Sequence, residues 1–172
     1  HRHYRRQRQM CIRDRLTKGK VFYDELNDSP DYPRSYGLAG WTKNDRRILI
    51  YDRYDIWEFN PDDATGIRLT KGREVKTSFR YVKLDPEKRH IEESSKMLMT
   101  TFNEITKNSG YFEYNYRNKK GKQLKDGPFR YSTPRKARLT DNVIFNRQSF
   151  EEYPNIRICL LYTSPSPRDP HL

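Results

Sequence analysis

Short runs rich in Ile, Val, Tyr, Phe and Trp recur along the chain in groups with a nearly constant spacing. The central apolar run of each group contains Ile48, Met97 or Val143, and these positions are 49 and 46 residues apart. Self-similarity at about 40 to 50 residues, with four short strands per unit, is typical of β-propeller blades. A β-sandwich also has regular short strands, but they are not grouped by four. The spacing therefore predicts an all-β fold, an incomplete β-propeller of about three blades of four-stranded antiparallel sheet.

Turn residues separate the expected strands. Two hairpins are predicted, one from residues 47–52 and 55–60 and the other from residues 96–103 and 111–116. The glycines in residues 36–41 suit a crowded inner strand, where the backbone must approach its neighbours closely. A short helix or a loop is expected at residues 148–152. The remaining predicted strands are residues 67–70, 79–84, 135–139, 142–147 and 155–158.

The two ends of the chain are related to each other as complementary DNA strands. Codons can be written for residues 10–14 (MCIRD) whose reverse complement, shifted by one base, encodes residues 159–163 (CLLYT). Two unrelated protein ends have no reason to share this relation, so both ends resemble read-through of a sequencing-library adapter. We therefore expect residues 1–15 and 159–172 to be non-native and disordered, and we assign the partial propeller to residues 16–158. The alternative is a basic arm that binds nucleic acid and a Pro-rich tail.

The charge of the chain depends on those two segments. The whole chain carries a net charge of +12, which would suggest nucleic acid or an acidic surface as a partner. Without the segments 28 basic and 21 acidic residues remain, a net charge of +7, and we expect no nucleic-acid partner. Both Cys11 and Cys159 also fall in the segments, so the rest can form no disulfide and no Cys-based zinc site. With 34% charged residues, a membrane span of about 20 apolar residues is excluded.

Residues 16–158 contain no catalytic or cofactor motif. His90 is the one histidine there, it lies beside Lys88 and Arg89, and no G-x-S-x-G elbow accompanies it. A Ser-His-Asp triad also needs a nucleophile and an orienting carboxylate, so His90 is expected to be a surface residue. No Gly-rich phosphate loop occurs. We therefore assign no catalytic, cofactor-binding or metal-binding residue.

Four acidic residues flank turns in the first unit: Asp52, Asp55, Asp62 and Asp63. A calcium loop requires the order D-x-[DN]-x-[DN]-G, which this stretch lacks. Short carboxylates beside turns more often accept hydrogen bonds from nearby backbone N–H groups. We therefore predict capping and turn hydrogen bonds for this group.

A basic loop at residues 118–122 follows an aromatic strand, a combination that proteins use to bind single-stranded nucleic acid. Strand alternation places Phe112, Tyr114 and Tyr116 on one face. We interpret that face as packing between blades and the lysines as a solvated hairpin tip.

An open arc leaves the radial faces of its first and last blades unpartnered. The 143 residues between the end segments hold about three units, whereas a closed propeller takes roughly four to eight blades. Trp57 and Phe59 of the first hairpin, and residues 112–116 of the second, are the apolar sets for such faces. The apolar residues of one hairpin can pack on those of the other, but those at the two ends of the arc are left facing water. We therefore expect the chain to aggregate.

Five stretches together resemble a known family. The most specific is YDRYDIWE at residues 51–58, and the resemblance covers most of residues 20–158. The sequence is similar to the propeller region of bacterial prolyl oligopeptidase family serine peptidases, particularly the large Bacteroidetes-type acylaminoacyl and dipeptidyl peptidases. The stretches are residues 31–41 (DYPRSYGLAGW), 48–62 (ILIYDRYDIWEFNPD), 69–72 (LTKG), 79–85 (FRYVKLD) and 145–154 (FNRQSFEEYP).

In that family the propeller precedes an α/β-hydrolase domain that carries the Ser, Asp and His, and it caps the active site so that only short or unfolded peptides enter. The resemblance implies that this chain is a fragment of the non-catalytic propeller, with peptide substrates met through a hydrolase domain outside it. A periplasmic or secreted location is implied as well. No triad position can be carried over onto this chain. The alternative is a propeller used only as a protein- or ligand-binding scaffold, with no hydrolase domain attached.

Overall fold

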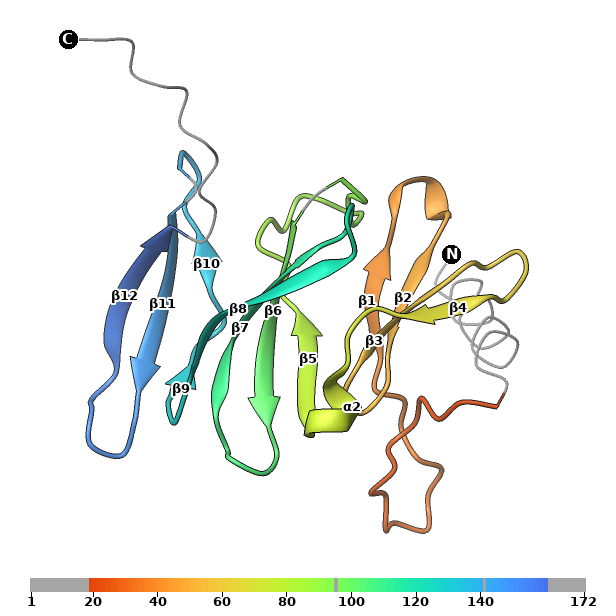
Figure 1. Cartoon of the computed structure of the whole chain (residues 1–172), viewed down its shortest axis with the longest axis horizontal. Helices are drawn as coiled ribbons and strands as arrows, with labels where there is room; N and C mark the ends of the chain where they lie inside the picture. The colour runs from red at the N-terminus through yellow and green to blue at the C-terminus, as the bar shows by residue number, and fades with distance from the viewer. Residues whose placement is uncertain (1–18, 95, 141, 161–172) are drawn as a thin grey trace, which may run out of the picture.

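The computed structural model describes residues 19–160 except 95 and 141, and every structural statement below refers to these residues. Within them the chain forms three four-stranded antiparallel sheets that follow one another in sequence and stand side by side (Figure 1). We call them blade 1, blade 2 and blade 3. The predicted all-β, incomplete propeller of about three blades is confirmed.

Blades 1 and 2 are meanders of short strands, whereas in blade 3 two of the strands pair with different parts of the same central strand. Blade 1 contains β1 (Leu38–Trp41), β2 (Ile48–Tyr51), β3 (Ile56–Phe59) and β4 (Gly66–Arg68). Blade 2 contains β5 (Thr77–Tyr81), β6 (Lys96–Asn103), β7 (Ser109–Asn115) and β8 (Lys120–Gly127). Blade 3 contains β9 (Arg130–Tyr131), β10 (Arg135–Lys136), β11 (Asn142–Gln148) and β12 (Asn155–Leu160). Two short helices, η1 (Lys43–Asp45) and α2 (Gly72–Val75), lie in connections.

Both predicted hairpins are present, as β2–β3 and β6–β7, and the strand expected at residues 96–103 has the bounds of β6. Two local expectations differ from the structure. α2 occupies residues where a turn was expected, and β8 begins inside the basic loop expected at 118–122. In the range 148–152, Gln148 ends a strand and residues 150–152 form bends, so the loop alternative holds there.

Blade 3 departs most from its predicted strands. The strand expected at residues 135–139 is reduced to β10, and β9 pairs separately with the other end of β11. Pro134 lies between β9 and β10, and proline has no N–H to give to a sheet. β12 continues through Leu160, two residues into the segment expected to be non-native. The disorder expected for residues 1–15 and for 161–172 falls outside the described residues.

Blades 1 and 2 pack face to face through one apolar cluster. The aromatic face predicted for the 111–116 strand lies in this cluster, so that prediction is confirmed. Burial of apolar side chains away from water at this interface makes the main favourable contribution to the free energy of forming the arc. The buried members are Leu49, Tyr51 and Ile56 from blade 1 and Phe79, Ile91, Met97, Met99, Tyr114 and Tyr116 from the chain of blade 2.

The opposite face of blade 2 packs on blade 3. Leu98 and Tyr111 lie in a buried cluster with Val143 and Phe145. The Tyr111 hydroxyl, which burial would leave without water, donates a hydrogen bond to the Ser132 carbonyl oxygen at 2.7 Å. Each face of blade 2 therefore has an apolar partner.

The outer face of blade 1 is covered, which corrects the expectation for Trp57 and Phe59. Cross-strand pairing sets Phe59 opposite Ile48 on the face turned away from blade 2. Phe22, in the segment before β1, is buried against both, with its ring 5.6 Å from that of Phe59. Phe59 is therefore buried and Trp57 half-buried, and neither belongs to the cluster with the second hairpin, because a phenylalanine from the N-terminal segment packs on this face instead.

The long connection between β5 and β6 also ties blade 2 to blade 1. Ile91 is buried, and its N–H donates to the Trp41 carbonyl oxygen at 2.8 Å. Gly40 in β1 has a φ of +152°, and a Cβ there would lie 3.2 Å from the Ile91 side chain. The close approach expected for the glycine-rich inner strand is therefore observed at Gly40.

Candidate functional site

The turn between β2 and β3 is held by Asp52. Its carboxylate accepts hydrogen bonds from the backbone N–H groups of Tyr54 and Asp55 and from the Trp57 indole N–H, the last at 2.9 Å. A carboxylate that satisfies consecutive backbone donors fixes a tight turn without the Asn-Gly pair that hairpins prefer. The hydrogen bonds to Asp52 therefore explain how a two-residue loop of Arg53 and Tyr54, which lacks the preferred Asn-Gly pair, can connect the two strands of the hairpin.

Asp55 is buried completely and links β3 to α2. Its carboxylate accepts hydrogen bonds from the Thr70 hydroxyl at 2.6 Å and from the backbone N–H groups of Gly72 and Arg73. Burial raises the pKa of Asp55, and these hydrogen bonds oppose the rise. The guanidinium of Arg68, 3.5 Å away, is a further source of compensation for the buried charge.

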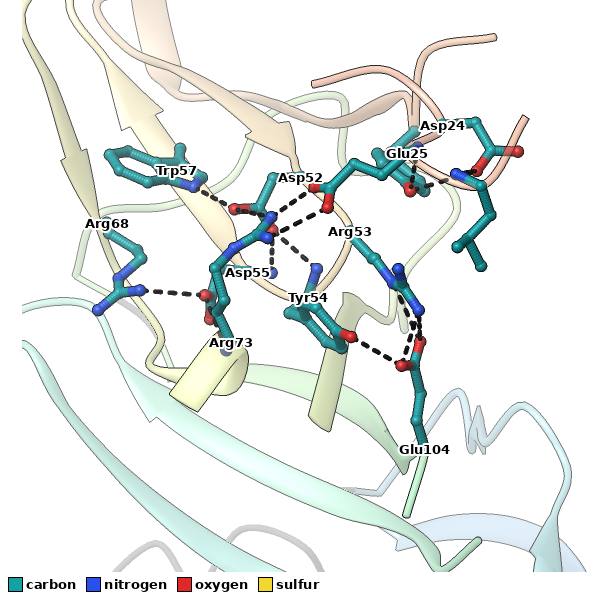
Figure 2. A network of polar contacts seen from close by, with 12 residues as sticks. Asp24, Glu25, Asp52, Arg53, Tyr54, Asp55, Trp57, Arg68, Arg73 and Glu104 are labelled. Atoms are coloured by element: carbon teal, nitrogen blue, oxygen red, sulfur yellow. Dashed lines mark hydrogen bonds and ion pairs between the residues drawn. The ribbon is translucent and has the colours of Figure 1, made fainter. Parts of the chain in front are cut away.

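Ion pairs extend this cluster to both neighbouring parts of the chain (Figure 2). Arg73 pairs with Glu25 of the N-terminal segment at 2.6 Å and with Asp52 at 3.5 Å. On the other side Arg53 pairs with Glu104, in the β6–β7 turn of blade 2, at 2.9 Å. We call Glu25, Asp52, Arg53, Tyr54, Asp55, Trp57, Arg68, Thr70, Arg73 and Glu104 the turn network.

Glu104 accepts two kinds of donor. The Tyr54 hydroxyl donates to it at 2.7 Å, beside the guanidinium of Arg53. Burial alone would raise the pKa of Glu104, but the hydrogen bonds from Tyr54 and Arg53 outweigh burial and the pKa lies below its usual value. Burial and the same hydrogen bond raise the pKa of Tyr54. Glu104 is therefore a carboxylate at neutral pH, and Tyr54 remains a neutral donor.

A cavity of about 240 Å³ lies between the N-terminal segment and blade 1, next to the turn network. The Lys20 ammonium sits 4.1 Å from the centre of the Trp57 ring at this cavity. Glu25 and Asp52 line it, but both are already bound by Arg73. The lining residues are Lys20, Val21, Phe22, Glu25, Asp52, Trp57 and Arg73.

The described residues hold no arrangement for nucleophilic catalysis around this network, since its carboxylates point at backbone donors, arginines and a tyrosine rather than at a histidine. His90 is exposed in the β5–β6 connection, on the surface where it was expected. No group of three or more His, Cys, Asp or Glu in this part of the chain is placed to hold a metal ion. It also contains no helix with the length and hydrophobicity that crossing a bilayer demands.

The two remaining acidic turn residues, Asp62 and Asp63, differ in the hydrogen bonds that they make. Asp63 accepts hydrogen bonds from the backbone N–H and the hydroxyl of Thr65, at 2.9 and 2.6 Å. Asp62 is exposed, and its backbone N–H donates to the Asn60 side chain at 3.2 Å. Asp52, Asp55 and Asp63 thus make the turn hydrogen bonds predicted for the group.

A second polar cluster was missed by sequence reasoning. Glu58 faces blade 2, where the Tyr116 hydroxyl donates to it and Lys119 pairs with it at 3.1 Å. Burial, followed by the bond to Glu58, raises the pKa of Tyr116 above its usual value. Lys119 is exposed like Lys120 and Lys122, as expected for a solvated tip, but it also takes part in a contact between blades. Glu58 and Lys119 are 61 residues apart, so local sequence patterns do not indicate that they pair. The spacing between blades is the one sequence signal that could have done so.

No protein-family model matches the chain, and no curated protein sequence matches it either. Among solved structures it is similar to a TolB candidate from Agrobacterium tumefaciens, with 17% sequence identity and a TM-score of 0.41. The match covers 73% of this chain and 47% of the other, so the chain spans about half of that structure's length. The blade packing of the chain itself defines its class: a partial β-propeller whose polar turn residues serve as scaffold contacts.

Proposed function

We propose that the chain is part of the non-catalytic propeller of a serine peptidase of the prolyl oligopeptidase family. One observation carries the proposal. The string YDRYDIWE, which is the most specific part of the resemblance, builds the β2–β3 hairpin, and its Asp52, Asp55 and Glu58 are all engaged in contacts within and between blades. Residues with such contacts stabilise the arrangement of the blades, which is the role expected of them in a non-catalytic propeller domain.

Such a propeller would cap the active site of a following α/β-hydrolase domain and filter peptides by size. Its own residues would neither attack nor protonate the substrate, which agrees with the contacts of the turn network. Peptides are thus the proposed substrate class of the whole protein, and the propeller needs no metal or cofactor for this role. We propose no nucleic-acid partner and favour a periplasmic or secreted location.

The test is to recover the continuous reading frame from the source DNA by long-read sequencing and to express the extended protein. We expect a G-x-S-x-G elbow downstream, and labelling of its serine by a fluorophosphonate probe. The 172-residue chain, run in parallel, should not be labelled. A downstream frame without a hydrolase domain would select the alternative, a propeller used only as a binding scaffold. Labelling of the short chain would overturn both.

We also propose that residues 1–15 and 159–172 derive from adapter DNA, on the strength of the complementary codons at the two ends. Amplification from the original DNA with primers placed outside the region should give other codons at both junctions. Recovery of the same codons would contradict this origin. The backbone of Cys159 and Leu160 pairs with β11, which any strand of suitable length can do because the ladder bonds involve only main-chain groups.

A further inference from the structure

A crevice of about 300 Å³ lies between blades 2 and 3, close to the β6–β7 turn. This volume is at the lower end of the range of ligand pockets, about 300 to 1,000 Å³. The rest of the interface between these blades is apolar, whereas six of the nine residues that line the crevice carry a hydroxyl group. These six are Ser78, Thr100, Thr101, Ser109, Tyr131 and Thr133.

Most of these hydroxyl groups are free to bind a ligand. Those of Ser78 and Thr100 donate to strand carbonyl oxygens, each at 3.4 Å, which is long for an O–H···O hydrogen bond. Those of Ser109, Tyr131 and Thr133 make no hydrogen bond within the described part of the chain. The crevice therefore offers several hydroxyl donors to a bound molecule.

Arg80, in β5, is the one charged side chain among the described residues that line the crevice. Its guanidinium donates to the carbonyl oxygens of Phe79, Asp52 and Arg53 at 2.8, 3.2 and 2.9 Å. These neutral acceptors orient the guanidinium without cancelling its charge. The Nε–H group takes no part in the three bonds, and it is not sealed in the interior.

Arg80 differs in its partners from the other partly buried arginines of the described ranges. Each of those pairs with a carboxylate, whereas Arg80 contacts carbonyl oxygens and the Tyr51 ring, whose centre lies 4.9 Å from the guanidinium carbon. Burial lowers the pKa of Arg80, but an arginine still carries its proton at neutral pH. The arginines with a carboxylate partner are Arg47, Arg53, Arg68, Arg73 and Arg147.

The acidic residues around the crevice have other partners, and none of those in the described ranges lines it. Glu104 belongs to the turn network, where it is already bound. Asp126, opposite Gly110 in the β7–β8 ladder, accepts a hydrogen bond from Asn108 at 3.2 Å. The positive charge of Arg80 is thus left for a bound anion, and hydrogen bonds to an ionised group are about twice as strong as those between neutral groups.

We propose that the crevice binds a small organic carboxylate, with its charged group at Arg80 and the hydroxyl groups and its apolar part against Phe102 and Tyr131. Phe102 lines the crevice and is 41% exposed, so its ring is open to such a contact. A molecule with both parts compensates the charge and covers the rings, whereas a bare phosphate ion covers neither ring. The site lies between two neighbouring blades of this chain and does not depend on the peptidase assignment.

The experiment is a saturation-transfer NMR titration of the full 172-residue chain with N-acetyl-L-phenylalanine, compared with the neutral N-acetyl-L-phenylalanine amide. We expect the acid to bind at least about tenfold more tightly than the amide, since only the acid carries the charge that Arg80 lacks a partner for. Arg80→Gln should remove this preference. Arg89→Gln is the matched control, because Arg89 is exposed in the β5–β6 connection and does not line the crevice, and it should keep the preference.

A second variant separates binding from folding, because Arg80 also holds the turn of blade 1. Thr133→Val keeps the shape and the charge of the crevice and removes one hydroxyl group that has no described partner. It should weaken binding of the acid about two- to tenfold, the range expected for one neutral hydrogen bond. Near-ultraviolet circular dichroism would show which variants are folded.

Four results would overturn the proposal. The first is that the acid does not bind, or binds no better than the amide. The second is that folded Arg80→Gln keeps the preference or that Arg89→Gln loses it equally, because the anion would then bind elsewhere. The third is an unchanged affinity in Thr133→Val, which also decides the matter if Arg80→Gln does not fold. The fourth is inorganic phosphate displacing the probe at equal concentration, because the site would then recognise charge alone.

Discussion

At several turns of this protein a single carboxylate accepts hydrogen bonds from arginine side chains or backbone N–H groups and so stabilises the local fold. Glu152 shows the rule outside the turn network: it accepts hydrogen bonds from Arg147 at 2.7 and 2.9 Å and from Arg157 at 2.9 Å. The bond from Arg147, with the others, lowers the pKa of Glu152 to about 2. Both Arg147 and Glu152 lie in the string 145–154 that carries part of the family resemblance, so that string too has a structural use.

We predict a pH-dependent effect for Glu152→Gln. The folded pKa is depressed, so the carboxylate stabilises the fold fully above its unfolded pKa of about 4.3, and this contribution is lost as the pH falls toward the folded pKa. Urea denaturation should show the variant less stable at pH 7 and the difference shrinking below about pH 5. A difference that grows on acidification would contradict the assigned ion pairs. Glu151→Gln, at the exposed neighbour, serves as the control.

At the scale of elements, the sequence predicts strands well where apolar residues alternate. It predicts elements poorly where contacts with residues distant in the sequence determine the local structure. The β2–β3 and β6–β7 hairpins follow from their aromatic and β-branched runs. β8 has three lysines and two glycines, a composition that strands disfavour, but it lies at the edge of its sheet, where lysine discourages pairing with other chains. α2 has only four residues, too few for a helical period, and it forms where Asp55 binds its first backbone N–H groups.

The β3–α2 connection gives the second prediction. Asp55→Ala leaves the Thr70 hydroxyl and the Gly72 and Arg73 N–H groups without an acceptor in a buried place, and we expect a loss of about 3 kcal/mol in the free energy of unfolding. Asp62→Ala, at an exposed turn, should change it by less than about 0.5 kcal/mol. Chemical denaturation of both variants measures the difference. Equal effects would show that the buried carboxylate does not hold the connection.

For the whole molecule, the 46- to 49-residue spacing was enough to predict the number of blades and their order. The turn network was only partly predictable, since turn hydrogen bonds follow from Asp at a turn, whereas the pairing of Arg53 with Glu104 joins residues 51 apart. The cover over blade 1 gave little signal. Phe22 lies in a run of three apolar residues, 21–23, which is too short to show a helical or strand period, and its burial depends on a face that only the folded blade creates.

Phe22 also keeps an apolar face of blade 1 from water, which gives the third prediction. Phe22→Ala should uncover Ile48, Ile50 and Phe59, so that each copy exposes an apolar blade face that is covered in the unmodified chain. An exposed apolar face promotes association, so light scattering should show a larger average mass for the variant than for the unmodified chain, and this mass should increase with concentration.

The control for Phe22→Ala is Leu26→Ala, in the same segment, where the side chain is 66% exposed and its removal uncovers no blade face. Near-ultraviolet circular dichroism would establish that both variants remain folded. If folded Phe22→Ala has the same mass distribution as the unmodified chain, the N-terminal segment does not close that end of the arc. Association of the chain would then not depend on whether that apolar face of blade 1 is exposed.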